Sequence, residues 1–195
     1  MYRCLIANRG EIAVRIIRAC RELNIETVAI YAKGDETSLH VSLADQAICI
    51  GEANPLDSYL NIDRIISAAK VTESNAIHPG YGFLSESTNF AKAVEDNHIH
   101  FIGPSKTTME MMGDKITARQ TVKQAGVPVI PGSNDAVQSV DEIKLLAKEI
   151  GFPVVLKAAS GGGGKGIRIV KEASQLDQAL KEAKSEGQKY FNDDR

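Results

Sequence analysis

The chain has 195 residues, of which 43% are hydrophobic and 25% charged, and its formal net charge is −2. This composition is typical of a globular protein, and a charge so near zero gives no basic surface for nucleic acid or an anionic membrane. The sequence has no apolar run of membrane-spanning length, no secretion signal at its start and no histidine pairs at metal-ligand spacing. The cysteines Cys4, Cys20 and Cys49 lie singly in apolar segments. We therefore expect a cytoplasmic protein with reduced core cysteines and no metal site made by its own side chains.

The first hundred residues alternate between short apolar runs and amphipathic segments. Ile12, Ile16 and Cys20 recur at helical spacing and predict one apolar helix face. The same reasoning predicts helices over residues 11–23, 61–70 and 86–97 and strands over residues 4–7, 27–31, 46–50, 75–78 and 100–102. Strands that alternate with helices predict an α/β fold with a doubly wound parallel sheet.

The pattern changes after residues 103–104. The later residues predict helices over 106–112, 115–125, 140–150 and 173–186, a turn-rich strand over 127–132, and strands over 154–159 and 167–170. Gly187 is expected to end the last helix. We place a domain boundary near residues 104–113 and divide the chain into domains 1–112 and 113–195. The second domain has few strands to cover its helices, so we expect it to be part of a larger one.

The most informative segment joins two predicted strands through a run of glycines. Its sequence is Val154-Val-Leu-Lys-Ala-Ala-Ser-Gly-Gly-Gly-Gly-Lys-Gly-Ile-Arg-Ile-Val170. Glycines leave backbone N–H groups free to approach a ligand, and Lys157 and Lys165 add positive charge, which suits phosphate oxygens. Gly161, Gly163 and Gly166 also fit G-x-G-x-x-G, but a strand follows them where a dinucleotide-binding turn would open a helix. The segment therefore predicts a flap that closes over a nucleotide triphosphate.

A run of glycine and serine is also typical of a flexible linker between domains. Two features favour phosphate binding over a linker. Strands flank the run closely, and Lys157 interrupts an otherwise apolar strand. A buried ammonium group is costly unless an anion meets it, so this position predicts a phosphate contact.

Lys115 is a second candidate, because it follows Asp114, the expected N-cap of the helix over residues 115–125. A lysine in the first helical turn opposes the helix dipole, and a bound anion would offset that cost. A solvated surface lysine is the alternative interpretation.

Two loops follow predicted strands at the sheet edge where α/β proteins bind ligands. One is His78-Pro-Gly-Tyr-Gly-Phe-Leu-Ser-Glu86, whose glycines and aromatic residues suit a pocket wall. The alternative is a tight turn in which Ser85 caps the next helix. The other loop, Asn8-Arg-Gly-Glu11, has a single glycine, which argues against nucleotide binding by the first strand–helix–strand unit.

Four motifs occur in an order and spacing similar to those of one known family. They are Ile6-Ala-Asn-Arg-Gly-Glu-Ile-Ala13, His78-Pro-Gly-Tyr-Gly-Phe-Leu-Ser-Glu86, Met112-Gly-Asp-Lys115 and Lys157-Ala-Ala-Ser-Gly-Gly-Gly-Gly-Lys-Gly166. Together they resemble biotin carboxylase, a family that includes a subunit of bacterial acetyl-CoA carboxylase and matching domains of pyruvate and propionyl-CoA carboxylases. The resemblance covers the whole chain and implies a Rossmann-like domain that precedes the ATP-grasp domain, followed by the first, lid-forming part of the ATP-grasp domain itself. Family members are well over twice as long, so the chain resembles their N-terminal portion.

The resemblance implies roles for particular residues. Lys115 and Lys157 match the two lysines that contact nucleotide phosphates, and Ile167 falls beside the adenine pocket. Tyr81 and Gly82 match the loop that borders the biotin site. The residues that match the lid over the triphosphate are Gly161, Gly162, Gly163, Gly164, Lys165 and Gly166. Lys165 stands where some relatives have arginine, and either residue can make a single charge contact.

The implied reaction is ATP-dependent carboxylation of biotin on a carrier protein. ATP phosphorylates bicarbonate to carboxyphosphate, which releases CO₂ to carboxylate the biotin ureido nitrogen, while lysines, lid amides and Mg²⁺ disperse phosphoryl charge. This is the first half-reaction of acetyl-CoA carboxylase, an enzyme of fatty acid synthesis, and the biotin carboxyl carrier protein and a carboxyltransferase are the partners. The family's Mg²⁺ ligands and bicarbonate-binding residues match no position up to residue 195. We therefore expect no catalytic residue within this chain and no activity from these residues alone.

The resemblance also implies a homodimer that uses the first predicted helix. Its isoleucines face inward, which leaves Arg15, Arg18 and Glu22 outward. Arg18 and Glu22 are four residues apart, so a pairing between them on a solvated face is the alternative.

Two other functions stay open from the sequence. One is a different ATP-grasp ligase, making carbamoyl phosphate or joining an amino acid, against which the loop over residues 78–86 argues. The other is a Rossmann-type NAD-binding module, against which the missing glycine triplet after the first strand argues. The sequence does not distinguish among the biotin-dependent carboxylases, although Met1 directly before the first strand favours a separate subunit.

Overall fold

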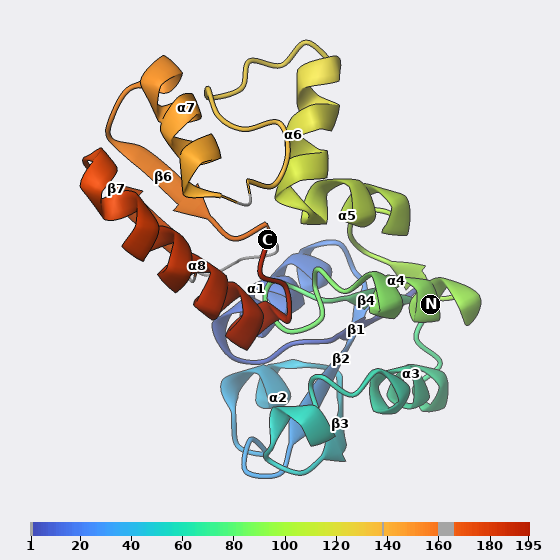
Figure 1. Ribbon diagram of the computed structural model, residues 1–195. Coiled ribbons are helices and arrows are strands. Elements are labelled where there is room, and N and C mark those ends of the chain that lie inside the picture. The colour runs from blue at the N-terminus through green and yellow to red at the C-terminus, as the bar shows by residue number, and fades with distance from the viewer. Residues whose placement is uncertain (1, 138, 160–165) are drawn as a thin grey trace. The chain divides into compact units, whose positions relative to one another are not determined.

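The computed structural model describes residues 2–137, 139–159 and 166–195, apart from the side chain of Phe191 (Figure 1). The chain forms two compact units, Met1–Met109 and Glu110–Arg195. Each unit has its own sheet.

The first unit is built around a five-stranded sheet. Its elements are β1 (Arg3–Ile6), α1 (Gly10–Glu22), β2 (Glu26–Ala32), α2 (Leu39–Leu43), β3 (Gln46–Gly51), η1 (Pro55–Asp57), α3 (Ile62–Val71), β4 (Ala76–His78), α4 (Thr88–Asp96), β5 (His100–Phe101) and α5 (Lys106–Gly113), which spans the division between the units. The strands pair in parallel in the order β3-β2-β1-β4-β5. The chain therefore starts inside the sheet, winds to one edge and returns to the other side of β1. The predicted doubly wound parallel sheet is confirmed, and α2 and η1 are additions to the predicted elements.

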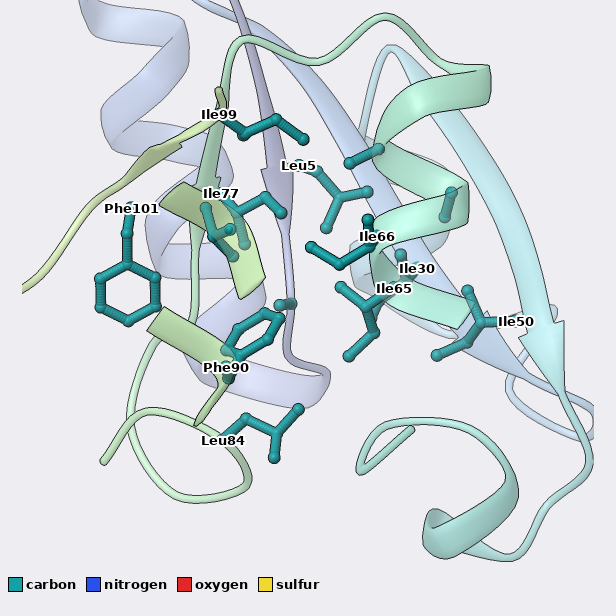
Figure 2. Close-up of a cluster of buried hydrophobic side chains, with 14 of the residues drawn as sticks. Leu5, Ile30, Ile50, Ile65, Ile66, Ile77, Leu84, Phe90, Ile99 and Phe101 are labelled. Atoms are coloured by element: carbon teal, nitrogen blue, oxygen red, sulfur yellow. The ribbon is translucent and has the colours of Figure 1, made fainter. Parts of the chain in front are cut away.

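Alternate side chains of the central strand enter two different cores. Leu5 of β1 belongs to a core that α3 and α4 cover, whereas its neighbours Cys4 and Ile6 belong to a core that α1 covers. The first of these cores also contains Ile30, Ile65, Ile66, Ile77 and Phe90, which Figure 2 labels. A sheet buried on both faces leaves the loops at its strand ends as the places where polar chemistry can meet a ligand.

The cysteine prediction is right for two positions and wrong for the third. Cys4 and Cys20 are buried, but Cys49 is exposed, and all three are free thiols. Cys49 lies on β3, an edge strand of the sheet, and shares an exposed face with Ala47 because strand side chains alternate. An apolar neighbourhood in the sequence did not reveal which face of this strand is covered.

The second unit contains a two-stranded antiparallel sheet. Its elements are α6 (Lys115–Gln124), α7 (Val140–Ile150), β6 (Val154–Lys157), β7 (Ile167–Val170), η2 (Ala173–Gln175) and α8 (Leu176–Phe191). Val154, Leu156 and Val170 belong to a small core with Ile143 of α7 and Leu176 of α8. The helix α8 runs alongside the hairpin in Figure 1, so one face of this sheet is covered.

Two predictions about the second unit are wrong. Residues 127–132 form no strand, because two prolines remove backbone donors and the segment stays largely exposed. Gly187 does not end the last helix, which continues to Phe191 and closes with Asn192 in the left-handed conformation (φ 53°). A Cβ at position 187 would lie 2.5 Å from the carbonyl oxygen of Asp193 and 3.5 Å from Cβ of Ala158. This glycine therefore serves close packing and not helix termination.

Candidate functional site

A cavity of about 710 Å³ lies within the second unit and is lined by residues of α6, α7, β6 and α8. Five basic and two acidic side chains line it: Lys115, Arg119, Lys157, Lys184, Arg195, Asp135 and Asp194. The guanidinium Nε of Arg119 is buried and has no hydrogen-bond partner among the described residues. An apolar cavity with an excess of cations and an unpaired buried donor is suited to an anionic ligand with an apolar part.

Lys115 is held at the start of α6 by the N-cap of that helix. The carboxylate Oδ1 of Asp114 accepts hydrogen bonds from the backbone N–H groups of Ile116 and Thr117, at 3.0 and 2.9 Å. Lys115 is half-buried, and its Nζ donates to the carbonyl oxygen of Ala159 at 3.2 Å. Burial lowers the pKa of Lys115, and the nearby charge of Lys157 lowers it further. The two predicted phosphate-binding lysines therefore line one cavity and repel each other, a cost that a bound anion would relieve.

Lys157 is not buried within its strand, so the argument that predicted its anion from burial is wrong. In β6 only Val154 and Leu156 turn toward the core, while Val155 and Lys157 lie on the other, exposed face. The antiparallel register pairs Lys157 with Ile167 and Val155 with Ile169. The short apolar run did not distinguish a strand buried on both faces from one buried on a single face.

The exposed face of the hairpin combines the lysine with apolar side chains. Val155, Ile167 and Ile169 are 49%, 37% and 67% exposed, and Lys157 lies among them. A ligand role was predicted for Ile167 but not for Val155. The signal for Val155 is its position two residues before Lys157, which places both side chains on the same face of the strand. An apolar surface beside a cation is suited to a planar base joined to phosphates.

The glycine-rich segment is described only at its last residue. Gly161, Gly162, Gly163, Gly164 and Lys165 lie outside the described residues. Gly166 is buried, has φ of +69°, and would place a Cβ 2.8 Å from Cβ of Ala158, so only glycine fits there.

A carboxylate of α8 holds the end of this segment. Oε2 of Glu186 accepts from the Gly166 N–H at 2.8 Å, and Oε1 accepts from Nη2 of Arg168 at 2.6 Å. Glu182 also pairs with Arg168, at 2.8 Å. These hydrogen bonds raise the pKa of Arg168 and lower that of Glu182. This network was not predicted from the sequence, because its partners lie 14 to 20 positions apart and no local motif joins them.

In the first unit, the loop over residues 78–86 follows β4 at the carboxyl edge of the sheet. Tyr81 is 59% exposed, its hydroxyl donates to the carboxylate of Glu11, and Gly82 has φ of +67°. The alternative prediction of Ser85 as the cap of the next helix is wrong. Ser87 is the N-cap of α4, and its Oγ accepts from the backbone N–H of Phe90 at 3.2 Å.

The outward face of α1 borders an open groove of about 750 Å³. Arg15, Arg18 and Glu22 are exposed there, as the sequence predicted, and Leu39 and His40 of α2 also line the groove. A groove with charged and apolar walls on one helix face is suited to contact with another protein surface.

The described residues contain neither a metal-binding cluster nor a membrane-spanning helix. Over residues 2–137, 139–159 and 166–195, no three His, Cys, Asp or Glu side chains are grouped closely enough to hold a metal ion. In the same part of the chain, every helix is too short or too polar to cross a membrane.

Comparison with family models identifies both halves of the chain. The model of the biotin carboxylase N-terminal domain matches residues 1–109, and that of the ATP-binding domain of the carbamoyl-phosphate synthase L chain matches residues 114–195. The class is thus a doubly wound N-terminal domain followed by an ATP-binding domain. Because the first match covers more than half of its residues, the chain belongs to the biotin carboxylase family.

Individual relatives agree with this assignment. Biotin carboxylase 1 of Bacillus subtilis is 53% identical over 97% of this chain, which spans 42% of that relative's length. A Campylobacter jejuni biotin carboxylase, solved as a β-γ-ATP complex, has a TM-score of 0.94 and 48% identity over 98% of this chain and 43% of its own. The biotin carboxylase domain dimer of the Hydrogenobacter thermophilus 2-oxoglutarate carboxylase was solved with MgADP, ADP and bicarbonate. It has a TM-score of 0.90 and 50% identity over 98% of this chain and 42% of its own.

Proposed function

We propose that the full-length protein that carries this sequence is a biotin carboxylase, which uses ATP and bicarbonate to carboxylate biotin on a carrier protein. The observation that carries the proposal is the 53% identity to a protein of that name across 97% of this chain. The cation-lined cavity of the second unit is the physical support, because it brings Lys115 and Lys157 to one anion-binding surface.

In this proposal the second unit binds the nucleotide. Lys115 and Lys157 hold the phosphates, Val155 and Ile167 contact the adenine, and the lid consists of Gly161, Gly162, Gly163, Gly164, Lys165 and Gly166. Bound ATP supplies the phosphoryl group that activates bicarbonate. The lysine ammonium groups stabilise the negative charge that develops on the transferred phosphoryl group, because they are in position before the reaction begins. The β-γ-ATP complex of the Campylobacter jejuni relative supports this assignment.

The donor set of the residues that the structure describes does not fit Mg²⁺. Magnesium prefers carboxylate oxygens in octahedral geometry, and the described residues contain no acidic cluster that could supply them. We infer that the Mg²⁺ ligands, the bicarbonate-binding groups and the remaining biotin contacts come from the rest of the full-length protein.

The first unit is proposed to supply residues that border the biotin site and a surface that forms the homodimer contact. Tyr81 and Gly82 border the biotin ring, and Arg18 and Glu22 lie at a homodimer contact along the α1 groove. The dimer of the Hydrogenobacter thermophilus relative supports that assembly. We further propose that the chain divides into domains 1–112 and 113–195 and that the protein is cytoplasmic. Its proposed partners are the biotin carboxyl carrier protein and a carboxyltransferase of fatty acid synthesis.

The proposal is tested by ADP release from the full-length protein. We expect release that depends on both bicarbonate and free biotin. Stimulation by ammonia or an amino acid, with biotin inert, would favour another ATP-grasp ligase. Thermal protection of the first unit by NAD, with ATP inert, would favour a dinucleotide-binding module.

A lysine variant tests the phosphate assignment. Lys157→Gln removes one charged contact from the triphosphate, so we expect KM for ATP to rise about tenfold or more and turnover to slow. Lys148→Gln, on the exposed surface of α7, is the matched control and should behave as wild type. If Lys157→Gln turned over at the wild-type rate, the proposed contact between this lysine and the phosphates would be wrong.

A further inference from the structure

The loops that follow β1 and β4 are joined through one buried side chain. Asn8 is 3% exposed, and its Nδ2 donates to the carbonyl oxygens of Pro79 and Tyr81 at 2.7 and 2.8 Å. Its Oδ1 accepts from the backbone N–H of Arg9 at 2.9 Å. Two donors on a single atom and an acceptor beside it are properties of a primary amide, so no other side chain of this size satisfies all three contacts.

Arg9 makes a second attachment to the same loop. Its guanidinium carbon lies 5.2 Å from the ring centroid of Tyr59 and 5.8 Å from that of Phe83. The two rings are stacked, with centroids 5.2 Å apart and planes 10° apart. Cation–π and stacking contacts of this geometry are attractive. They fix Phe83, whose φ of 41° is rare for a bulky residue, two positions after Tyr81.

Asp35 holds both Tyr59 and Arg9 of this stack. Its Oδ2 accepts from the Tyr59 hydroxyl at 2.6 Å and from Nη1 of Arg9 at 3.2 Å. Burial alone would raise the pKa of Asp35, but the hydrogen bonds from Tyr59 and Arg9 outweigh it and lower the pKa. The carboxylate therefore stays ionised and keeps the arginine in place over the rings.

Close packing completes the connection. Gly80 has φ of +66°, and a Cβ there would lie 3.0 Å from Nδ2 of Asn8 and 3.0 Å from Cγ1 of Ile12. The loop thus approaches α1 as closely as its backbone allows. The exposed Tyr81 and Gly82 are carried on a segment that is tied down on both sides, at Pro79 and at Phe83.

We propose that Asn8 and Arg9 are positioning residues for the biotin site, and that they set the affinity for biotin by holding Tyr81 and Gly82 in one conformation. This inference rests on the proposed function, because the place of biotin beside Tyr81 comes from it. Neither residue belongs to the nucleotide-binding unit, so the effect should fall on biotin and leave ATP unaffected. Pre-organising a binding loop raises affinity by removing the cost of ordering it.

The test uses steady-state kinetics of the full-length protein with free biotin. Asn8→Asp replaces the two N–H donors with an oxygen that repels both carbonyl groups, and should raise KM for biotin about tenfold or more, with KM for ATP within about twofold. Arg9→Lys keeps the charge but loses the planar stacking, and should raise KM for biotin about threefold. Arg64→Lys, an exposed arginine of α3, is the matched control.

A second readout separates positioning from contact with biotin and from misfolding. Hydrogen exchange of the amides of residues 80–85, without biotin, should be faster in both variants than in wild type, while the amides of β1 and β2 keep wild-type protection. If Asn8→Asp fails to fold, Arg9→Lys carries the test, because the Arg9 side chain is 45% exposed and its substitution spares the core.

Each outcome decides the inference. Wild-type KM for biotin in both variants, or an equal rise in KM for ATP and biotin, overturns it while the proposed function stands. A raised KM for biotin with unchanged exchange of residues 80–85 also overturns it, because the residues would then act by direct contact. Wild-type protein that shows no biotin-dependent turnover defeats the proposed function, and this inference with it.

Discussion

The two units bury their sheets differently. The first unit covers both faces of a five-stranded parallel sheet with helices, and most residues of its strands β1, β2 and β4 are buried. The second unit covers one face of a two-stranded hairpin and exposes Val155, Ile167 and Ile169 on the other. The first unit therefore uses its apolar residues for stability, while the second also presents them at its surface.

This difference indicates where each unit can bind a ligand. In the first unit the candidate site residues Tyr81 and Gly82, with the buried Asn8 beside them, lie in the loops after β1 and β4, at the carboxyl edge of the sheet. In the second unit a lysine lies directly on a strand face, among apolar side chains that are exposed. Exposed apolar patches of this kind often mark binding surfaces, which supports the proposal that the hairpin itself is the binding element of the second unit.

The largest expected effect comes from the same substitution in the two sheets. Ile30 of β2 is 0% exposed and Ile169 of β7 is 67% exposed. Ile30→Ala should lower the free energy of unfolding by about 2–5 kcal/mol, because it removes buried methyl groups and leaves a cavity. Ile169→Ala should change it by less than about 0.5 kcal/mol. Urea denaturation of both variants measures the contrast, and equal losses would mean that the hairpin face is not a free surface.

The same contrast explains how far the sequence predicted the fold. In the first unit, short apolar runs and helices with a 3.6-residue apolar period agree with the packing, and helix 11–23 is found as α1 (Gly10–Glu22). In the second unit, the run around Lys157 looks like a buried strand, yet only one face is covered. Periodicity over four residues contains too little information to distinguish these cases. Gly187 was misread because close packing against Ala158 and Asp193 is a tertiary property.

The candidate site was predictable where it depended on local chemistry. Asp114 caps α6 as its sequence position indicated, and Lys115 and Lys157 line one cavity. Val155 and Glu186 were missed, since their roles follow from strand register and from a helix packed on a hairpin. The contacts of Asn8 with Pro79 and Tyr81 join residues more than seventy positions apart, and no single-sequence pattern contains such pairs.

A smaller effect is expected from two glycines of the second unit that have opposite surroundings. Gly187→Ala gains about 1 kcal/mol in helix propensity, but its Cβ would lie 2.5 Å from a backbone oxygen. We expect a net loss of about 1–2 kcal/mol in the free energy of unfolding, because the backbone must move. Gly113→Ala in α5, where a Cβ would meet no atom within 4 Å, should instead gain about 0.5–1 kcal/mol. Thermal denaturation shows whether each variant is more or less stable than wild type. A more stable Gly187→Ala would show that the backbone at Asp193 moves away from the added Cβ at little cost.

The pH dependence of stability between pH 7.5 and 5 should have a histidine component only in the first unit, since all four histidines lie there. Burial lowers the pKa of His40 and of His78. Nε2 of His40 lies 3.2 Å from the carbonyl oxygen of Ile30 and must be the protonated nitrogen of a neutral ring, while Nδ1 has no partner among the described residues. Burial is the largest influence on the pKa of His40 and lowers it, while the nearby charge of Asp35 raises this pKa and that of Arg9 lowers it.

The sign follows from proton binding. Histidines of the unfolded chain titrate near pH 6.5, whereas His40 and His78 of the folded protein titrate below that, so the unfolded state binds more protons in this window. Stability should therefore fall as pH falls through about 6.5, by at most about 1.4 kcal/mol per pH unit for each histidine. His40→Gln should flatten the slope, and the exposed His100→Gln is the matched control. An unchanged slope in His40→Gln would mean that this ring accepts a proton without opening the fold.

The smallest effect concerns reactivity and tests whether the core beneath α1 is closed. The hydrogen bond between Cys4 and Cys20 raises the pKa of Cys4 above its usual range and lowers that of Cys20 to about 7. Thiolate content alone would therefore make Cys20 the most reactive thiol. Cys20, however, is only 7% exposed, and a reagent must reach the sulfur. The exposed Cys49 should therefore be alkylated by iodoacetamide roughly a hundredfold faster or more.

Peptide mapping during the reaction identifies the modified residue, and Cys49→Ser should remove the fast phase. A fast phase that persists in Cys49→Ser would place it on Cys20, and would show that α1 separates from the sheet far more readily than a core buried on both faces allows.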